Sequence, residues 1–158
     1  MRRITLIIGL SLLLVALTVG SVMAKTGASS GAHYLDEPTV TVSGNTLTVS
    51  GRAAGLGNVG SVTIDLDGTV DVSSRCYTKS NNKPQAANKQ ETINVDQEQN
   101  VPARNGSVTF SFDVTPLSTL TCPPGQRAVL ESISWNLDLT FPLYPELDRN
   151  LTGSRSFV

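Results

Sequence analysis

The sequence has little of the chemistry from which most active sites are built. Its 158 residues include one histidine and two cysteines, which excludes a zinc site of histidine and cysteine ligands. Charged residues make up 16% of the chain and aromatic residues 5%. The net charge of −1 lacks the basic excess that nucleic-acid-binding domains usually carry. We therefore expect no His/Cys metal centre, no cofactor and no nucleic-acid partner.

The first 24 residues have the organisation of a secretory signal peptide. Two arginines precede an uncharged apolar run from Ile4 to Gly20, and small residues surround a cleavage site after Ala24. The alternative, an uncleaved anchor, would be short, because about 17 apolar residues are near the lower limit for crossing a bilayer. We expect residues 1–24 to be removed. The mature form would then have no membrane span and be secreted, or periplasmic if the host has an outer membrane.

Apolar residues recur at every second position from Thr39 almost to the end of the chain, which is typical of strands with one buried and one solvated face. No window after the leader shows comparable helical spacing, and β-branched residues dominate the runs. We predict an all-β fold, an antiparallel β-sandwich of immunoglobulin-like architecture, in one domain over residues 39–158. The clearest apolar row is Ile133, Trp135, Leu137, Leu139 and Phe141.

Turn residues and composition divide the chain further. Ser43-Gly44-Asn45 lies between two alternating runs and predicts a hairpin. Asp67-Gly68 is a strong two-residue turn signal and predicts a second hairpin, whose return strand carries Val70, Val72 and Cys76. Residues 25–38 are small and polar, and we predict a flexible N-terminal arm there.

The segment 78–105 is rich in asparagine, glutamine and lysine and breaks the alternating pattern, apart from one short strand around Ile93 and Val95. We predict a long polar loop, and loops beyond about 12 residues in compact domains are usually functional or disordered. This loop is the candidate binding site. Its candidate binding residues are Tyr77, Lys79, Asn81, Asn82, Lys83, Gln85, Asn88 and Lys89.

Two cysteines in an exported chain favour one intramolecular disulfide. Cys76 has the same parity as the apolar residues of its run and should point into the core, and Cys122 has the same parity as Leu120. We predict a structural Cys76–Cys122 bridge. A redox-active pair is not expected, because the chain has no C-x-x-C motif.

Asp65, Asp67 and Asp71 crowd the Asp-Gly signal and are the only candidates for a cation site. Calcium prefers several carboxylate and carbonyl oxygens, but the spacing of these three lacks the EF-hand pattern and its terminal glutamate. A carboxylate pair for glycoside hydrolysis could also come from this cluster, but nothing in the sequence fixes its separation. We expect a solvated strand face without a metal.

No residue has the surroundings expected of a catalytic group. His33 could act as a general base, but it lies in the predicted arm, and the chain has no G-x-S-x-G motif. Asn105 and Asn150 begin N-x-S/T sequons, which matter only in a host that glycosylates. We expect a protein that is not an enzyme.

Four short motifs resemble those of a group of small exported bacterial β-proteins. They are Gly55-Leu-Gly-Asn58 before a strand, Cys76 followed by Asn81-Asn82-Lys-Pro84, Asn105-Gly106 before Val108-Thr-Phe110, and Cys122-Pro123-Pro124. The resemblance covers residues 43–141. The chain departs from the pattern where glycines are expected, with Lys83 and Ala86-Ala87 in their place. It implies export, an all-β fold and the disulfide, and it implies no activity.

The leading functional hypothesis is a secreted binding or surface-interaction module that acts through the polar loop. Function concentrates in loops on rigid scaffolds, and Arg75, Lys79, Lys83 and Lys89 would attract a cell-envelope polymer or another surface protein of negative charge. The alternatives are a structural or self-assembling extracellular protein, joined through sheet edges by the arm or the last strand, and a hydrolytic enzyme. The sequence leaves the oligomeric state open.

Overall fold

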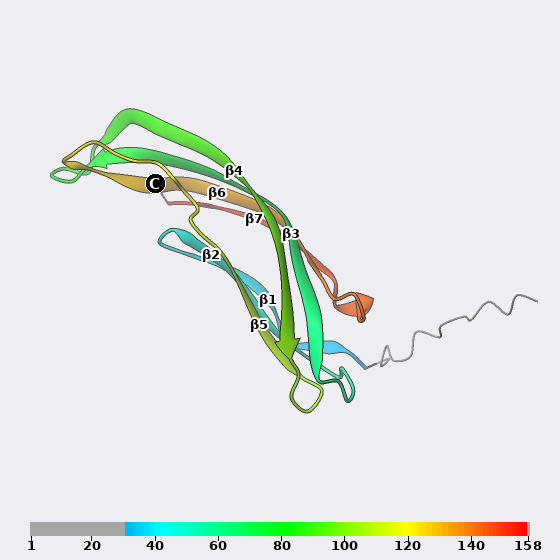
Figure 1. Ribbon diagram of the computed structural model, residues 1–158. Helices are drawn as coiled ribbons and strands as arrows, with labels where there is room; N and C mark the ends of the chain where they lie inside the picture. Colours follow the sequence, from blue (N-terminus) through cyan, green and yellow to red (C-terminus); the bar gives the residue numbers. More distant parts are fainter. Residues whose placement is uncertain (1–30, 158) are drawn as a thin grey trace, which may run out of the picture.

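The computed structural model describes residues 31–157 (Figure 1). The predicted leader and residues 25–30 of the predicted arm lie outside this range. The described residues form two packed antiparallel sheets, with strand orders β1-β2-β5 and β4-β3-β6-β7. This confirms the all-β sandwich. The elements are β1 (His33–Ser43), β2 (Thr46–Ala54), β3 (Ser61–Thr78), β4 (Pro84–Pro102), β5 (Val108–Val114), β6 (Gln126–Thr140), the 3-10 helix η1 (Pro145–Leu147) and β7 (Arg149–Ser156).

The core is built from the alternating apolar rows of both sheets. Phe110 of β5 meets Phe141 edge to face, with ring centroids 5.8 Å apart, and joins the two layers. Each such side chain contributes about 1.5–3 kcal/mol when fully buried. The largest fully buried side chains are Tyr144, Phe110, Phe112, Phe141, Leu47, Leu56, Ile64, Leu66, Leu117, Ile133, Leu137 and Leu139.

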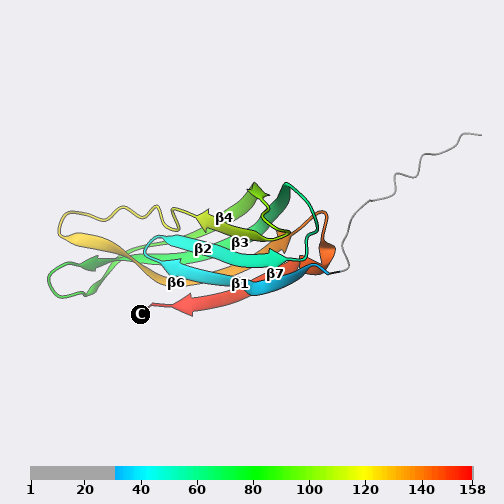
Figure 2. The same cartoon turned by 90° about the horizontal axis from the view of Figure 1, so that it is seen from below.

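The two sheets differ in length. β3 and β4 have 18 and 19 residues, whereas β2 and β5 have 9 and 7. The four-stranded sheet therefore extends beyond the β1–β2 hairpin, as Figures 1 and 2 show. We call this extension and its surroundings the distal end, made of residues 43–46, 73–91, 115–132 and 155–157. The opposite end, with the start of β1 and the β4–β5 turn, is the proximal end.

The predicted hairpin at Asp67-Gly68 is wrong. β3 runs unbroken through Gly68, which pairs with Val95 on one side and Leu137 on the other. Gly68 has a φ of +136°, and a Cβ at this position would lie 2.2 Å from the carbonyl oxygen of Asn136. A glycine inside a strand often marks such a bend or close approach of backbones. In isolation, the Asp-Gly dipeptide favours a two-residue turn. Within β3, its glycine instead allows the long strand to bend.

The predicted polar loop over residues 78–105 is also wrong, because most of it is the edge strand β4. This strand pairs with β3 from Pro84, opposite Tyr77, to Pro102, opposite Ser61. Its outer face is exposed to solvent and needs no apolar residues. Two of its inner-facing residues are polar as well: Gln97 and Gln99 donate hydrogen bonds of 3.1 and 3.0 Å to backbone carbonyls of β5. The polar composition thus reflects an edge position.

The predicted arm over residues 25–38 is wrong from His33 onward, where β1 begins. The Tyr34 ring packs on Phe141, with centroids 6.2 Å apart, and its hydroxyl donates to the carbonyl of Leu147. The pairing of β1 with β2 shifts register twice between Tyr34 and Thr39. These irregularities remove the alternation by which the strand could have been recognised, and the sandwich begins at residue 33 rather than 39.

Candidate functional site

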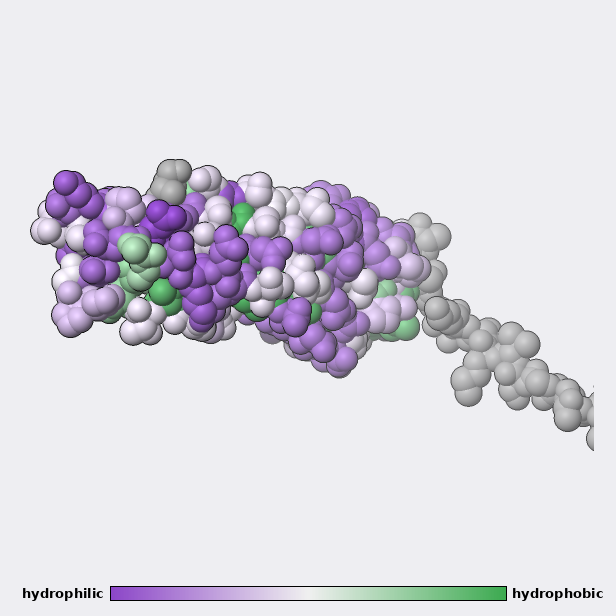
Figure 3. Space-filling view, turned by 90° about the horizontal axis from the view of Figure 1, so that it is seen from above, coloured by the Kyte–Doolittle hydropathy of each residue, from purple (hydrophilic) through white to green (hydrophobic). Residues whose placement is uncertain are grey.

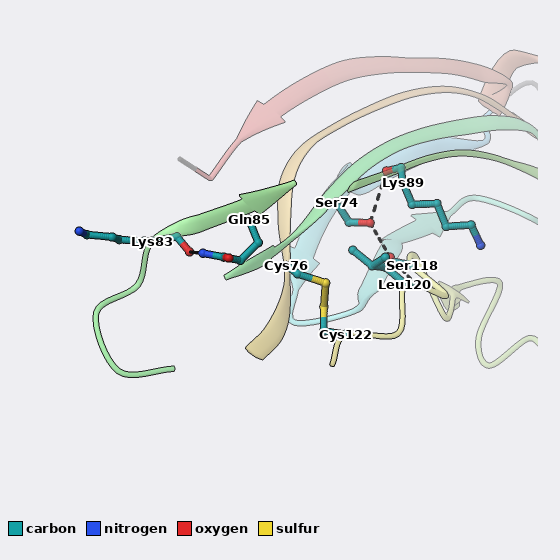
Figure 4. Close-up of a disulfide and its surroundings, with 8 residues drawn as sticks. All are labelled: Ser74, Cys76, Lys83, Gln85, Lys89, Ser118, Leu120 and Cys122. Atoms are coloured by element: carbon teal, nitrogen blue, oxygen red, sulfur yellow. Dashed lines mark hydrogen bonds between the residues drawn. A yellow bond between two sulfur atoms is a disulfide. The ribbon is translucent and has the colours of Figure 1, made fainter. Parts of the chain in front are cut away.

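The predicted disulfide is confirmed. Cys76 and Cys122 are bonded, with Cα atoms 5.7 Å apart (Figure 4). Cys76 is fully buried on β3, as its parity predicts. Cys122 belongs to the connection between β5 and β6, residues 115–125. The bridge therefore holds this connection against the end of β3 within the distal end.

The turn between β3 and β4, residues 79–83, is short and firmly bonded. The backbone N–H groups of Thr78 and Asn82 donate 3.0 Å hydrogen bonds to Lys83 and Thr78, and Arg127 donates to the Asn82 side chain at 2.8 Å. Asn82 has a φ of +53°, which asparagine tolerates well. The side-chain oxygen of Asn81 accepts a hydrogen bond from Thr78. The turn therefore presents the exposed side chains of Lys79 and Lys83 on a defined backbone, and Figure 4 shows Lys83 pointing away from the sandwich.

Tyr77 does not belong to an exposed binding surface, contrary to the sequence-based interpretation. Only 8% of it is exposed, and its hydroxyl donates to Glu131 at 3.1 Å. Burial, followed by the hydrogen bond to Glu131, raises the pKa of the tyrosine. Gln85 donates to the neighbouring carbonyls of Lys83 and Pro84. Of the predicted binding residues on β4, Asn88 and Lys89 are exposed, opposite Arg75 and Ser74.

Lys89 belongs to a hydrogen-bonded network around Glu91. Its ammonium lies 2.9 Å from the Glu91 carboxylate, which also accepts hydrogen bonds from the backbone N–H and the hydroxyl of Thr119, at 2.9 and 2.6 Å. Ser118 contributes a further bond to Glu91 and lies 2.8 Å from the buried hydroxyl of Ser74 (Figure 4). This Glu91 network fixes the 115–125 connection to β3 and β4. The sequence gives no local signal for it, because its partners are far apart in the chain.

The network predicts an acid-sensitive contribution to stability. The hydrogen bonds from Thr119, and then Lys89, lower the pKa of Glu91 from 4.5 to about 2. A lowered pKa stabilises the fold at pH values above the unfolded-state pKa, and this stabilisation is lost as the pH falls from about 4.5 to about 2. Glu91→Gln should lower the free energy of unfolding by about 2 kcal/mol at pH 7, which is the usual contribution of hydrogen bonds to a charged group. Urea unfolding should show this deficit shrinking toward pH 2; a deficit that is constant with pH would exclude an ionised Glu91 as its source.

A groove of about 520 Å³ lies between the tip of the β1–β2 hairpin and β6. Apolar groups from the connection, β6 and the end of the described chain line it, together with the Ser74 hydroxyl. Its lining residues are Gly44, Asn45, Ser74, Ser118, Leu120, Arg127, Ala128, Val129, Leu130 and Phe157.

Charge is divided unequally between the distal end and the rest of the described molecule. The distal end has six cationic residues, Arg75, Lys79, Lys83, Lys89, Arg127 and Arg155, and two acidic ones, Glu91 and Glu131. The two acidic residues are already paired, with Lys89 at 2.9 Å and Arg75 at 3.1 Å. Elsewhere within residues 31–157 there are 11 acidic and three cationic side chains. The distal end is thus a positive pole on an acidic molecule.

The three candidate cation ligands lie on the solvated face of β3. Asp67 is directly opposite Asp96 and Asp138 on the neighbouring strands, and Asp65 is opposite Glu98. Among the described residues, no group of three or more histidine, cysteine or acidic side chains could hold a metal ion. The face of the molecule drawn in Figure 3 is largely hydrophilic, and its apolar residues form small separate patches.

The remaining candidates lie apart from the distal end. His33 begins β1 at the proximal end, with its Nδ1 2.7 Å from the carbonyl oxygen of Gly31. The sequon asparagine Asn105 is exposed in the β4–β5 turn, and Asn150 is exposed on β7, where its amide donates to Asn136 and Asp138. The structure does not bring these residues together with the predicted binding residues.

No helix within residues 31–157 is long and apolar enough to cross a membrane. No protein-family model matches the chain, and no curated protein is similar to it.

Proposed function

We propose that the chain is an exported, non-enzymatic binding module that attaches to an anionic polymer of the cell envelope through its distal end. The observation that carries the proposal is the position of Lys79 and Lys83. Both are exposed on a rigid turn at the positive pole, and neither forms an ion pair with a described residue. Because the turn already holds these lysines on an ordered backbone, binding loses less conformational entropy.

The division of charge would also orient the module. The positive pole attracts a polyanion, while the acidic remainder of the molecule is repelled from it, so that the long axis points away from the polymer. The disulfide supports export, because such bonds persist in oxidising compartments outside the cytosol. The same bond ties the 115–125 connection to β3, and the backbone N–H of Lys79 donates a 2.9 Å hydrogen bond to Gly125 of that connection, which helps to hold the turn in place.

The test measures binding to immobilised poly(glycerol phosphate), with uncharged dextran as the control polymer. Lys79→Gln/Lys83→Gln removes two charges from the distal turn, and Arg52→Gln/Arg104→Gln removes two exposed charges at the proximal end. A lysine near an anionic surface is worth about 1 kcal/mol, so the distal variant should bind at least about tenfold more weakly. The proximal variant should stay within about twofold of the parent chain.

The outcomes separate the proposal from nonspecific attraction. Added salt should weaken the binding of the parent chain and reduce the difference between the two variants, because surface charges are screened. An equal loss of affinity in both variants would show that net charge alone determines binding. Unchanged affinity in both variants would show that the distal turn has no part in binding. Either result contradicts the proposal.

A further inference from the structure

β6 extends beyond its outer neighbour. β7 pairs with β6 only from Leu139 back to Ser132, opposite Ser156, and a last hydrogen bond of 2.9 Å joins Phe157 to the carbonyl of Glu131. The first five residues of β6, Gln126 to Leu130, continue along β3 without a strand partner on their other side within the described chain. An exposed run of this kind is able to pair with another extended chain.

The groove follows this open edge. Four consecutive residues of β6, Arg127 to Leu130, line it, so that it borders both faces of the strand as well as its edge. Leu120 and Phe157 add apolar surface on either side. Phe157 directly follows β7, so the groove of about 520 Å³ reaches the point where β7 stops pairing with β6. The groove thus combines a backbone edge with apolar side-chain contacts, the two elements of strand addition.

The edges of the smaller sheet are covered, in contrast. Gln97 and Gln99 donate to the carbonyls of β5, and Arg155 donates to the carbonyl of Val42 on β1 at 3.3 Å. Such side chains satisfy backbone groups that would otherwise pair with a foreign strand. At Glu131 the Ser156 hydroxyl donates to the backbone carbonyl at 3.4 Å. The edge of β6 at residues 126–130 has no comparable cover among the side-chain hydrogen bonds of the described residues.

The charges around the groove indicate what sort of strand would fit. Arg127 lines the groove, and its contact with Asn82 places it next to the turn that carries Lys79 and Lys83. The nearby acid on β6, Glu131, is paired with Arg75. A strand with a carboxylate near Arg127 would therefore gain charge complementarity, and a cationic strand would be repelled.

We propose that this groove is a second binding site, which takes an extended peptide segment of a partner protein as an added strand beside residues 126–130. The segment has apolar side chains at alternate positions and an acidic residue that faces Arg127. The site uses the edge and groove of β6 rather than the turn of residues 79–83, and it does not depend on the polymer-binding activity proposed above.

The probe is a fluorescein-labelled peptide, Thr-Val-Asp-Val-Thr-Val, titrated with the exported chain and followed by fluorescence anisotropy. Two comparison peptides replace the aspartate by lysine or carry N-methyl groups on alternate residues, which blocks strand pairing and leaves the side chains unchanged. The exposed Ala128 in the groove is replaced in Ala128→Lys, and the matched control is Ala86→Lys, an exposed alanine on β4 at the same end. Both variants gain the same charge.

The parent chain and Ala86→Lys should bind the aspartate peptide with dissociation constants that differ by no more than about twofold. Ala128→Lys should bind this peptide at least about tenfold more weakly than the parent chain. The lysine and N-methylated peptides should also bind at least about tenfold more weakly. Amide hydrogen exchange should slow within residues 126–130 in the complex. Equal binding of the N-methylated peptide, equal binding by the two lysine variants, or no binding of the aspartate peptide below about 1 mM would overturn the proposal.

Discussion

Replacing Gly68 by alanine is expected to destabilise the protein by about 3–5 kcal/mol, which combines backbone strain with overpacking. Its φ of +136° is a conformation that side-chain-bearing residues rarely adopt. The new Cβ would lie 2.2 Å from the Asn136 carbonyl oxygen and 2.9 Å from the Leu137 Cα atom. Backbone atoms in the middle of a sheet cannot move aside without breaking the pairing of β3 with β6. Equilibrium unfolding in urea measures the loss.

Gly57→Ala is the matched control. Gly57 also has a positive φ, of +73°, but no atom outside its chain neighbours would lie within 4 Å of an added Cβ. This substitution should cost about 1 kcal/mol, because strain acts there without a clash. Similar losses in the two variants would mean that β3 does not bend against β6 at Gly68 as described.

Removal of the disulfide is expected to cost about 4 kcal/mol on the chain-entropy model, because the bond closes a separation of 46 residues. Cys76→Ala and Cys122→Ala should each lower the stability by the same amount, since either change breaks the one bond. The double variant should be no less stable than either single variant. Thermal unfolding under non-reducing conditions measures all three.

Mass spectrometry of the parent chain provides the control, because an intact bond leaves no thiol to alkylate. The fold should survive in each variant as a less stable sandwich, because its core lies mainly in the apolar rows beyond the bond. Strongly unequal losses in the two single variants, or additive losses in the double variant, would contradict a purely structural role for the bond.

The sequence predicts the strands of the sandwich correctly where one face of a strand is buried and the other is exposed to solvent. The rows around Phe110 and Leu137 alternate without interruption, and both are fully buried in the structure. The parity of Cys76 predicts its burial for the same reason. Trp135 shares the inner face of β6 but is only partly buried, because its ring lies over Gly153 of the edge strand β7.

Prediction from the sequence fails where the same composition is compatible with two different structures. A polar run describes a loop and also an edge strand such as β4, because an edge strand has solvent on its outer face and at one side. The dipeptide at Gly68 favours a turn locally, but pairing with β4 and β6 on both sides overrides this preference.

The predicted site residues are only partly brought together. Lys79, Asn81, Asn82 and Lys83 share the distal turn, whereas Tyr77 and Lys89 have internal hydrogen-bond or ion-pair partners. Glu91 and Arg127 were missed because their importance comes from contacts across 28 and 45 residues of sequence. Their identity as charged residues next to a turn or a long connection is the only signal that the sequence offers.

The most direct measurement is a backbone amide spectrum of the isotopically labelled chain during titration with soluble poly(glycerol phosphate). If the distal end is the binding surface, shifts should concentrate at residues 79–83 and at Arg127. The amides of the proximal β4–β5 turn, residues 103–107, should stay in place. Shifts centred on the proximal end, or spread evenly along both sheets, would contradict the account.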